Sequence, residues 1–133
     1  MSNEVFINLP VADLEAAKDF YSIWGWKNIP EYTDDNAACM NFGGNVYVML
    51  ITKEFFPTFI DKPIADTSTH SAAIYCLGLP SAEEVTERAD AAIAAGGIKG
   101  KELPDMGMPD MHIRNFFDLD GHAWELMHMP VDQ

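Results

Sequence analysis

The sequence presents the same order of predicted elements twice, and this repeat constrains the fold more than any other feature. Each half reads strand, helix, strand, strand, strand. The residues that begin the helices, Asp13 and Ser81, lie 68 positions apart (81 − 13), and the glycines that end them, Gly25 and Gly97, lie 72 apart (97 − 25). A duplicated supersecondary unit places equivalent signals at such a spacing. We therefore predict an α+β fold made of two βαβββ modules.

Local signals give the boundaries of these modules. Apolar residues recur at helical spacing after Asp13, and Ser81 with Glu84 three positions later forms a capping box before the second helix. Strands are expected at residues 4–11, 26–33, 37–42, 46–52, 70–77, 98–103, 111–117 and 122–129. The chain is thus predicted to be one domain, 1–133, with modules at about 1–52 and 70–133 joined by a connector, 53–69.

Composition excludes several classes of partner. Twenty-one acidic and eight basic residues give a net charge of −13, which would repel a phosphate backbone and anionic lipid. No apolar run is long enough to cross a bilayer, and the first residues carry no basic segment of a signal peptide. We expect a cytoplasmic protein without nucleic acid or membrane partners. Cys39 and Cys76, which lack a close second cysteine, are interpreted as buried reduced thiols.

The last hairpin contains the first candidate for function. Asp120-Gly121 separates two apolar and aromatic runs within residues 115–129, as in a tight β-turn. Glu125 lies in the second run, among Ala, Trp, Leu and Met residues. A carboxylate there is costly to bury unless it is paired, hydrogen-bonded or bound to a cation, although it could also lie on a solvated strand face.

The final strands of the two modules can be aligned residue by residue, Gly44 to Leu50 against Gly121 to Met127. This alignment sets Glu125 opposite Val48. One module would then hold a carboxylate where the other holds an aliphatic side chain, which solubility does not explain if the position faces inward.

Three stretches carry a resemblance to a known family. Residues 6–26 (FINLPVADLEAAKDFYSIWGW), residues 114–130 (RNFFDLDGHAWELMHMP) and the segments 35–40 and 47–50 resemble the vicinal oxygen chelate superfamily, which includes glyoxalases, bleomycin resistance proteins and extradiol dioxygenases. They are most similar to its branch of predicted lactoylglutathione lyases. The resemblance implies an open, cupped, mixed β-sheet and a homodimer.

In metal-dependent members of that superfamily, the first and last strands of each module supply the ligands. The resemblance implies His70 and Glu125 as ligands and Glu125 as the catalytic group. Phe6 stands where a histidine or glutamine is usual, and Val48 stands at the equivalent of the last-strand ligand. A catalytic divalent ion usually has about three protein donors. Asn8, on the strand face of Phe6, offers one weak oxygen.

Three further histidines, His112, His122 and His128, are also candidates. His122 and His128 are each an odd number of positions from Glu125, so in a regular strand they face the opposite side. With so few donors, we expect one divalent ion (Zn, Ni, Fe or Mn) to be bound weakly or not at all.

Two functions follow from the resemblance, with a structural or interaction protein as a third possibility. The first is a metal-assisted lyase or isomerase acting on a small oxygen-bearing metabolite. The alternative is a non-catalytic binder that sequesters a small apolar or aromatic ligand in the dimer cleft. Its pocket would contain Phe6, Asn8, Val48 and Met127, and the methionines concentrated near the C-terminus favour such adaptable binding.

Overall fold

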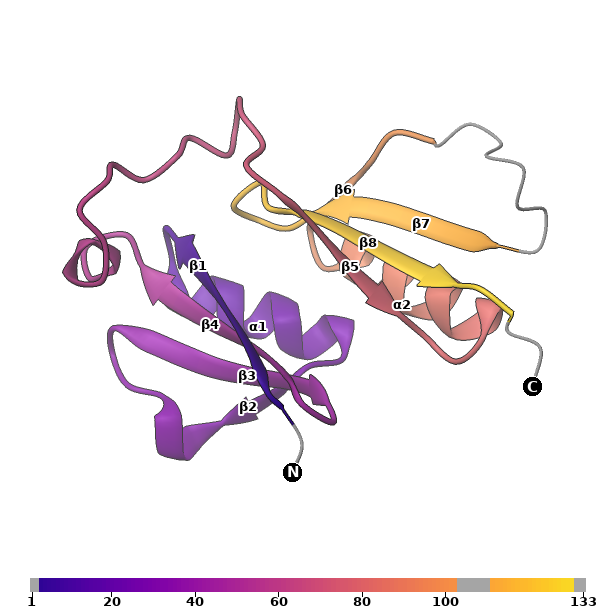
Figure 1. Cartoon of the computed structure of the whole chain (residues 1–133), viewed down its shortest axis with the longest axis horizontal. Helices are drawn as coiled ribbons and strands as arrows, with labels where there is room; N and C mark the ends of the chain where they lie inside the picture. Colours follow the sequence, from indigo (N-terminus) through magenta and orange to yellow (C-terminus); the bar gives the residue numbers. More distant parts are fainter. Residues whose placement is uncertain (1–2, 103–110, 131–133) are drawn as a thin grey trace.

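The computed structural model describes residues 3–102 and 111–130, which form two four-stranded mixed sheets, each with one helix (Figure 1). The first sheet has the order β1-β4-β3-β2 and the second the order β5-β8-β7-β6. In each, the first and last strands of the module pair in parallel and the other pairs are antiparallel. The predicted pair of βαβββ modules is confirmed.

The elements are β1 (Val5–Val11), α1 (Leu14–Trp24), β2 (Lys27–Ile29), β3 (Ala37–Gly43), β4 (Val46–Thr52), β5 (Ile74–Gly78), α2 (Ala82–Ala94), β6 (Ile98–Lys99), β7 (His112–Phe117) and β8 (Ala123–His128).

The helices begin where the sequence predicts. The Asp13 side chain accepts a hydrogen bond from the Ala16 amide at 3.0 Å, and Ser81 accepts one from the Glu84 amide at 3.1 Å. Helix α1 ends at Gly25, whose φ of 128° suits a residue without a side chain. The residue with positive φ after α2 is Gly96, one position earlier than expected.

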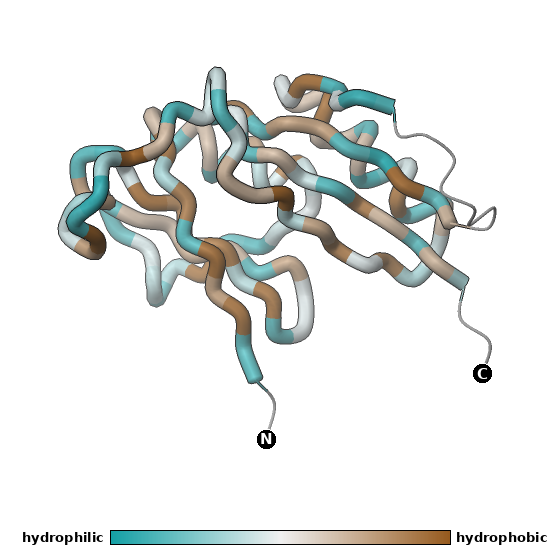
Figure 2. The backbone as a smooth tube through the Cα atoms, turned by 45° about the horizontal axis from the view of Figure 1, so that its top comes forward, coloured by the Kyte–Doolittle hydropathy of each residue, from teal (hydrophilic) through white to brown (hydrophobic). Residues whose placement is uncertain are grey.

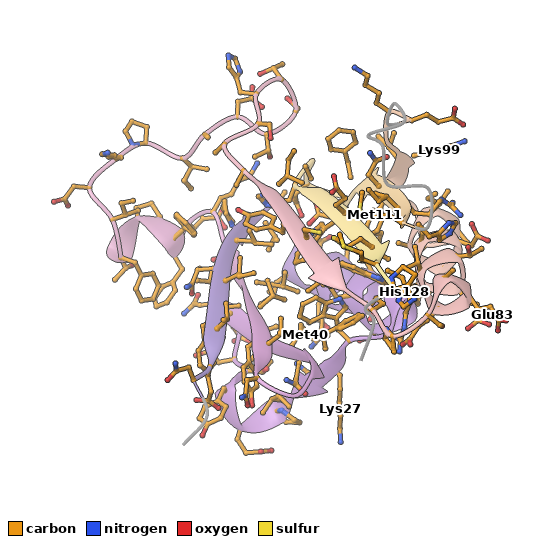
Figure 3. The ribbon with its side chains drawn as sticks, turned by 45° about the vertical axis from the view of Figure 1, so that its right-hand side comes forward. Lys27, Met40, Glu83, Lys99, Met111 and His128 are labelled. Atoms are coloured by element: carbon orange, nitrogen blue, oxygen red, sulfur yellow. The ribbon has the colours of Figure 1, made fainter. Side chains whose placement is uncertain are left out.

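The core lies between the two sheets and the two helices, and it contains residues of both modules. Helices α1 and α2 contact each other, and α2 contacts β7 and β8. Trp24 on α1 packs edge-on against Phe116 at 4.9 Å and Trp124 at 5.0 Å between ring centroids. Figure 3 shows Met40 within the body, whereas Lys27, Glu83 and Lys99 extend away from it. The modules therefore share one interior.

Several predicted strands differ from the observed ones. The strand expected at 26–33 is limited to Lys27–Ile29, because Pro30 has no amide hydrogen for the ladder and begins a short 3-10 helix, η1 (Pro30–Tyr32). The strand expected at 70–77 begins only at Ile74. The strand expected at 98–103 is observed as Ile98–Lys99, and residue 103 lies outside the described residues. The connector contains one 3-10 turn, η2 (Phe56–Thr58).

Each sheet presents one face to the helices and the other away from them, and we call the latter its open face. Side chains alternate between the two faces along every strand. Figure 2 shows apolar residues along most of β1 and a mixture of hydrophilic and hydrophobic residues along β7 and β8.

No helix in the described part of the chain is long and apolar enough to span a membrane.

Candidate functional site

Glu125 lies in the middle of β8 and faces away from the core. Its neighbours on the flanking strands are Cys76 on β5 and Asn115 on β7. The residues before and after it, Trp124 and Leu126, are 1% and 0% exposed and belong to the core, so alternation places Glu125 on the open face. Glu125 itself is half-buried.

The surroundings of Glu125 on the open face are mostly apolar. Strand pairing places Ile74, Ile113, Phe117, Ala123 and Met127 on the same face. Ile74 is 64% exposed and Phe117 is 36% exposed. A carboxylate in such surroundings can accept hydrogen bonds from one polar group of a molecule whose remainder is apolar.

Cys76 is a neutral neighbour of this carboxylate. The prediction that both cysteines are buried is wrong for Cys76, which is exposed, while Cys39 is buried. Partial desolvation raises the pKa of the Cys76 thiol, and the negative charge of Glu125 raises it further. Since the thiolate is the nucleophilic and metal-binding form, Cys76 is a weak nucleophile and a weak metal ligand at neutral pH.

The pocket residues predicted in the first module lie on two different faces. The Phe6 ring stacks on Tyr47 with centroids 4.6 Å apart and planes 9° apart, and both side chains lie on the open face of the first sheet. Asn8 follows on the same face. Val48, in contrast, is 0% exposed and belongs to the core cluster. The prediction that Val48 lines a pocket with Phe6 is therefore wrong.

The register of the strands explains this error. Phe6 pairs with Tyr47 and Asn8 with Met49, as Ile74 pairs with Ala123 and Cys76 with Glu125. The first strands are thus related by 68 positions (76 − 8), the same spacing as the helix caps, and the last strands by 76 (125 − 49). The sequence alignment used a spacing of 77 (125 − 48), and a shift of one residue moves a side chain to the other face. The counterpart of Glu125 is Met49.

The same register shows that Ile74, and not His70, occupies the first-strand position of the second module. Ile74 corresponds to Phe6 (6 + 68). His70 lies in the connector before β5, is exposed, and has its Nδ1 2.7 Å from Thr69 Oγ1. No hydrogen bond joins His70 to Glu125 within the described residues. Both first strands therefore present an apolar side chain, Phe6 or Ile74, at this position.

The remaining histidines are occupied away from the open face. His112 Nε2 lies 3.0 Å from Thr86 Oγ1 on α2. His128 Nδ1 lies 2.9 Å from the carbonyl oxygen of Leu79. His122, 5% exposed, has its Nε2 2.8 Å from the Pro10 carbonyl oxygen. These contacts agree with the opposite orientation expected for His122 and His128.

A buried polar cluster joins the two modules, and the sequence reasoning missed it. Tyr21 donates to Asp118 at 2.6 Å and accepts from Trp124 Nε1 at 3.0 Å. Asp118 also accepts from the amides of Asp120 and His122, each at 2.9 Å. The sequence signal for this cluster is Asp118, which lies two positions before Asp120-Gly121 and which the turn pattern alone explains only as part of a turn. Burial and then the Asp118 charge raise the pKa of Tyr21 well above its ordinary value, so its hydroxyl stays protonated.

Comparison with known proteins supports one family. Residues 4–43 match a family described as bleomycin resistance protein-like N-terminal. A hypothetical protein from S. aureus is 26% identical, with a TM-score of 0.78, and the match covers 96% of this chain and 95% of that one. A glyoxalase/bleomycin resistance protein/dioxygenase family enzyme from Burkholderia phytofirmans is 14% identical, also with a TM-score of 0.78, over 97% of this chain and 100% of that one.

The chain has the fold of the glyoxalase/bleomycin resistance protein/dioxygenase family, and its first module is similar in sequence to a bleomycin resistance protein-like N-terminal region. Among curated proteins none matches the sequence. Another similar structure is a variant of the fosfomycin resistance protein FosX from Listeria monocytogenes in complex with Mn(II) and 1S,2S-dihydroxypropylphosphonic acid. It is 19% identical, with a TM-score of 0.71, over 98% of this chain and 93% of that one.

The described side chains of this protein fit a metal ion poorly. Among residues 3–102 and 111–130, no three His, Cys, Asp or Glu side chains are close enough to hold an ion together. Phe6 and Ile74 offer no donor atom, and Cys76 holds its proton. Glu125 remains as one carboxylate, short of the roughly three donors of a catalytic site.

Proposed function

We propose that the protein binds a small, mostly apolar molecule on the open face of the second sheet, where Glu125 accepts hydrogen bonds from its single polar group. The observation that carries the proposal is the composition of this face. Among the described residues of β5, β7 and β8 that lie on it, Glu125 is the one with a charge, and most of the others are apolar. Sequestration of a ligand needs no further chemical group.

A homodimer would complete the site. The two sheets share no strand ladder within the described chain, so Phe6 and Glu125 lie on separate open faces of one protomer. A second copy related by two-fold symmetry could place its first open face, with the stacked Phe6 and Tyr47, over the second open face of its partner. The exposed Phe6 (48%) and Ile74 (64%) would then be covered. The proposal includes a cytoplasmic location, which suits two cysteines without a disulfide.

The metal-assisted lyase is the second candidate, supported by the Mn(II) complex of FosX. In this chain such an ion would have Glu125 as ligand and displaced base, with His70 as the expected second ligand. The missing first-strand donors count against it. A bound ion would act as a Lewis acid on two adjacent oxygens of the substrate.

Calorimetric titration with 1-naphthylmethanol, an aromatic body with one hydroxyl, tests the binding proposal. We expect binding by the wild type, at least about tenfold weaker binding by Glu125→Ala, and a smaller loss in Glu125→Gln, which keeps one acceptor oxygen. Glu83→Ala, an exposed carboxylate on α2, is the matched control and should bind as the wild type does. Equal affinity in Glu125→Ala would contradict the proposal.

Elemental analysis after incubation with Mn, Zn, Ni or Fe separates the two candidates. We expect far less than one equivalent of any metal per protomer, because one carboxylate holds an ion weakly. One equivalent in the wild type that disappears in Glu125→Ala would favour the metal-assisted lyase.

A further inference from the structure

A cavity lies at the turn between β7 and β8, and Glu125 is not among its lining residues. Its volume is about 590 Å³, which lies in the range of small-molecule sites. We call it the turn cavity. The connector passes beside the β7–β8 turn at this point (Figure 1), and the lining includes Ala12 and Lys53, the residues that directly follow β1 and β4. The rest of its lining is Asp66, Thr67, Ser68, Ile98, Phe117, Asp118, Leu119, Asp120 and Gly121.

Hydrogen bonds hold the walls of the turn cavity in place. Thr67 Oγ1 donates to the carbonyl oxygen of Asp120, which fixes the connector against the turn. The Ala12 amide donates to Asp120 Oδ1 at 2.9 Å, which fixes the turn against the first module. The connector also approaches Gly121 so closely that a Cβ there would collide with the Thr67 carbonyl. The cavity is therefore formed before any ligand arrives, which lowers the entropic cost of binding.

The cavity combines acidic groups with an apolar wall. Asp118 is engaged with Tyr21 and with backbone amides, but Asp120 and Asp66 each have one carboxylate oxygen without a hydrogen-bond partner within the described chain. Ile98, Phe117 and Leu119 lie on the cavity with 66%, 36% and 44% of their surface exposed. Lys53 is the basic residue of the lining, so the cavity has a net negative charge.

Asp120 is the best placed of these acidic groups. Partial burial raises the pKa of its carboxyl, and the nearby Asp118 charge raises it further, against the opposing effects of the Ala12 amide, His122 and Lys53. A cation close to Asp120 would replace the solvation that this carboxylate has lost. A bare metal ion would leave the apolar wall uncovered, whereas an organic cation would use both features.

We propose that the turn cavity is a binding site for a small organic ammonium ion, whose charged nitrogen donates to Asp120 and Asp66 while its hydrocarbon part covers Phe117 and Leu119. Glu125 does not line this cavity, and Phe117 is the residue that the cavity shares with the open face. Lys53 at the rim disfavours ligands with additional positive charge.

NMR titration of ¹⁵N-labelled protein with n-butylammonium chloride at pH 7 tests this proposal. We expect saturable shifts of the Thr67, Asp120 and Gly121 amides, and at least about tenfold weaker binding of n-butanol and of butyrate, which lack the positive charge. Equal binding of n-butanol, or saturable shifts confined to residues outside the cavity lining, would overturn the proposal.

Two variants sharpen the test. Asp120→Asn retains an oxygen for the Ala12 amide and so should fold, but it should bind n-butylammonium at least about tenfold more weakly. Leu119→Ala should weaken n-butylammonium binding without changing the charge. Glu83→Gln, at an exposed carboxylate on α2, is the matched control and should bind n-butylammonium as the wild type does. Unchanged affinity in Asp120→Asn would overturn the turn cavity proposal, and loss only in Glu125→Gln would move the ammonium ion to the open face.

Discussion

Tyr21 and Asp118 form a buried 2.6 Å hydrogen bond between the first helix of one module and the last hairpin of the other. The two residues lie 97 positions apart in the sequence. Asp118 is 3% exposed and Tyr21 is 1% exposed, so neither group can turn to water instead. The bond therefore holds the two modules in one arrangement, in addition to the aromatic packing around Trp24.

Tyr21→Phe should destabilise the protein by about 1–3 kcal/mol, because it leaves an oxygen of Asp118 and the Trp124 N–H without their partner in the interior. Urea unfolding followed by circular dichroism measures this change. Tyr32→Phe is the matched control, since Tyr32 is 69% exposed and should change stability by less than about 0.5 kcal/mol. Equal stability of the two variants would mean that the bond contributes nothing to the folded state.

The raised pKa of Asp120 predicts a pH dependence of stability. The folded state binds this proton more tightly than the unfolded state. The contribution of the Asp120 carboxyl to the free energy of unfolding is therefore greatest at low pH. It is lost as the pH rises from the ordinary pKa of 3.8 through the folded-state pKa. Asp120→Asn cannot titrate, so its stability relative to the wild type should rise over that range. Urea unfolding at several pH values measures the difference, and a constant difference would contradict the prediction.

Much of the fold could be predicted because its signals are local. The helix caps Asp13 and Ser81, the helical spacing of the apolar residues that follow each cap, and the glycine turns all act within a few residues of the chain. The register of β8 was not predictable in this way, because it depends on the strands beside it. An alignment error of one residue placed Val48 with Glu125, although Val48 lies in the core.

The partners of the candidate site escaped prediction for a similar reason. Cys76 and Asn115 become neighbours of Glu125 only through strand pairing, which joins residues 49 and 10 positions from it (125 − 76 and 125 − 115). The prediction of His70 as a ligand depends on a strand that begins at residue 70, whereas β5 begins four residues later, at Ile74. Met106 and Met108, two of the methionines that favoured a ligand binder, lie outside the described residues.

The proposed homodimer predicts that charges on the open faces will separate the protomers. Ile74→Asp should give the monomer mass in light scattering at micromolar concentration, because it would place an unpaired charge in the covered interface. The matched control is Ile23→Asp. Ile23 is 60% exposed on α1, away from both open faces, and its variant should keep the mass of the wild type. A wild type of monomer mass would contradict the homodimer itself.

The vacant ligand position can be tested by restoring a donor. Ile74 lies on the open face beside Ala123, two residues along β8 from Glu125, so Ile74→His should place an imidazole near the carboxylate. We expect zinc or nickel affinity to rise at least tenfold, about 1.4 kcal/mol, in calorimetric titration. Unchanged affinity in Ile74→His would mean that Ile74 does not stand at the first-strand ligand position.

Phe6→His tests whether a second copy contributes to the same site. Phe6 lies on the other sheet, where it pairs with Tyr47 and not with β8, so in an isolated protomer a histidine there has no carboxylate partner on its own face of the ladder. In the proposed homodimer it would face the partner's second open face and add a donor to Ile74→His. The double variant should then bind zinc about tenfold more tightly than Ile74→His, and this gain should vanish at protein concentrations low enough for the dimer to dissociate. Equal affinity of the double and single variants at concentrations where the protein is dimeric would place Phe6 outside the Glu125 site.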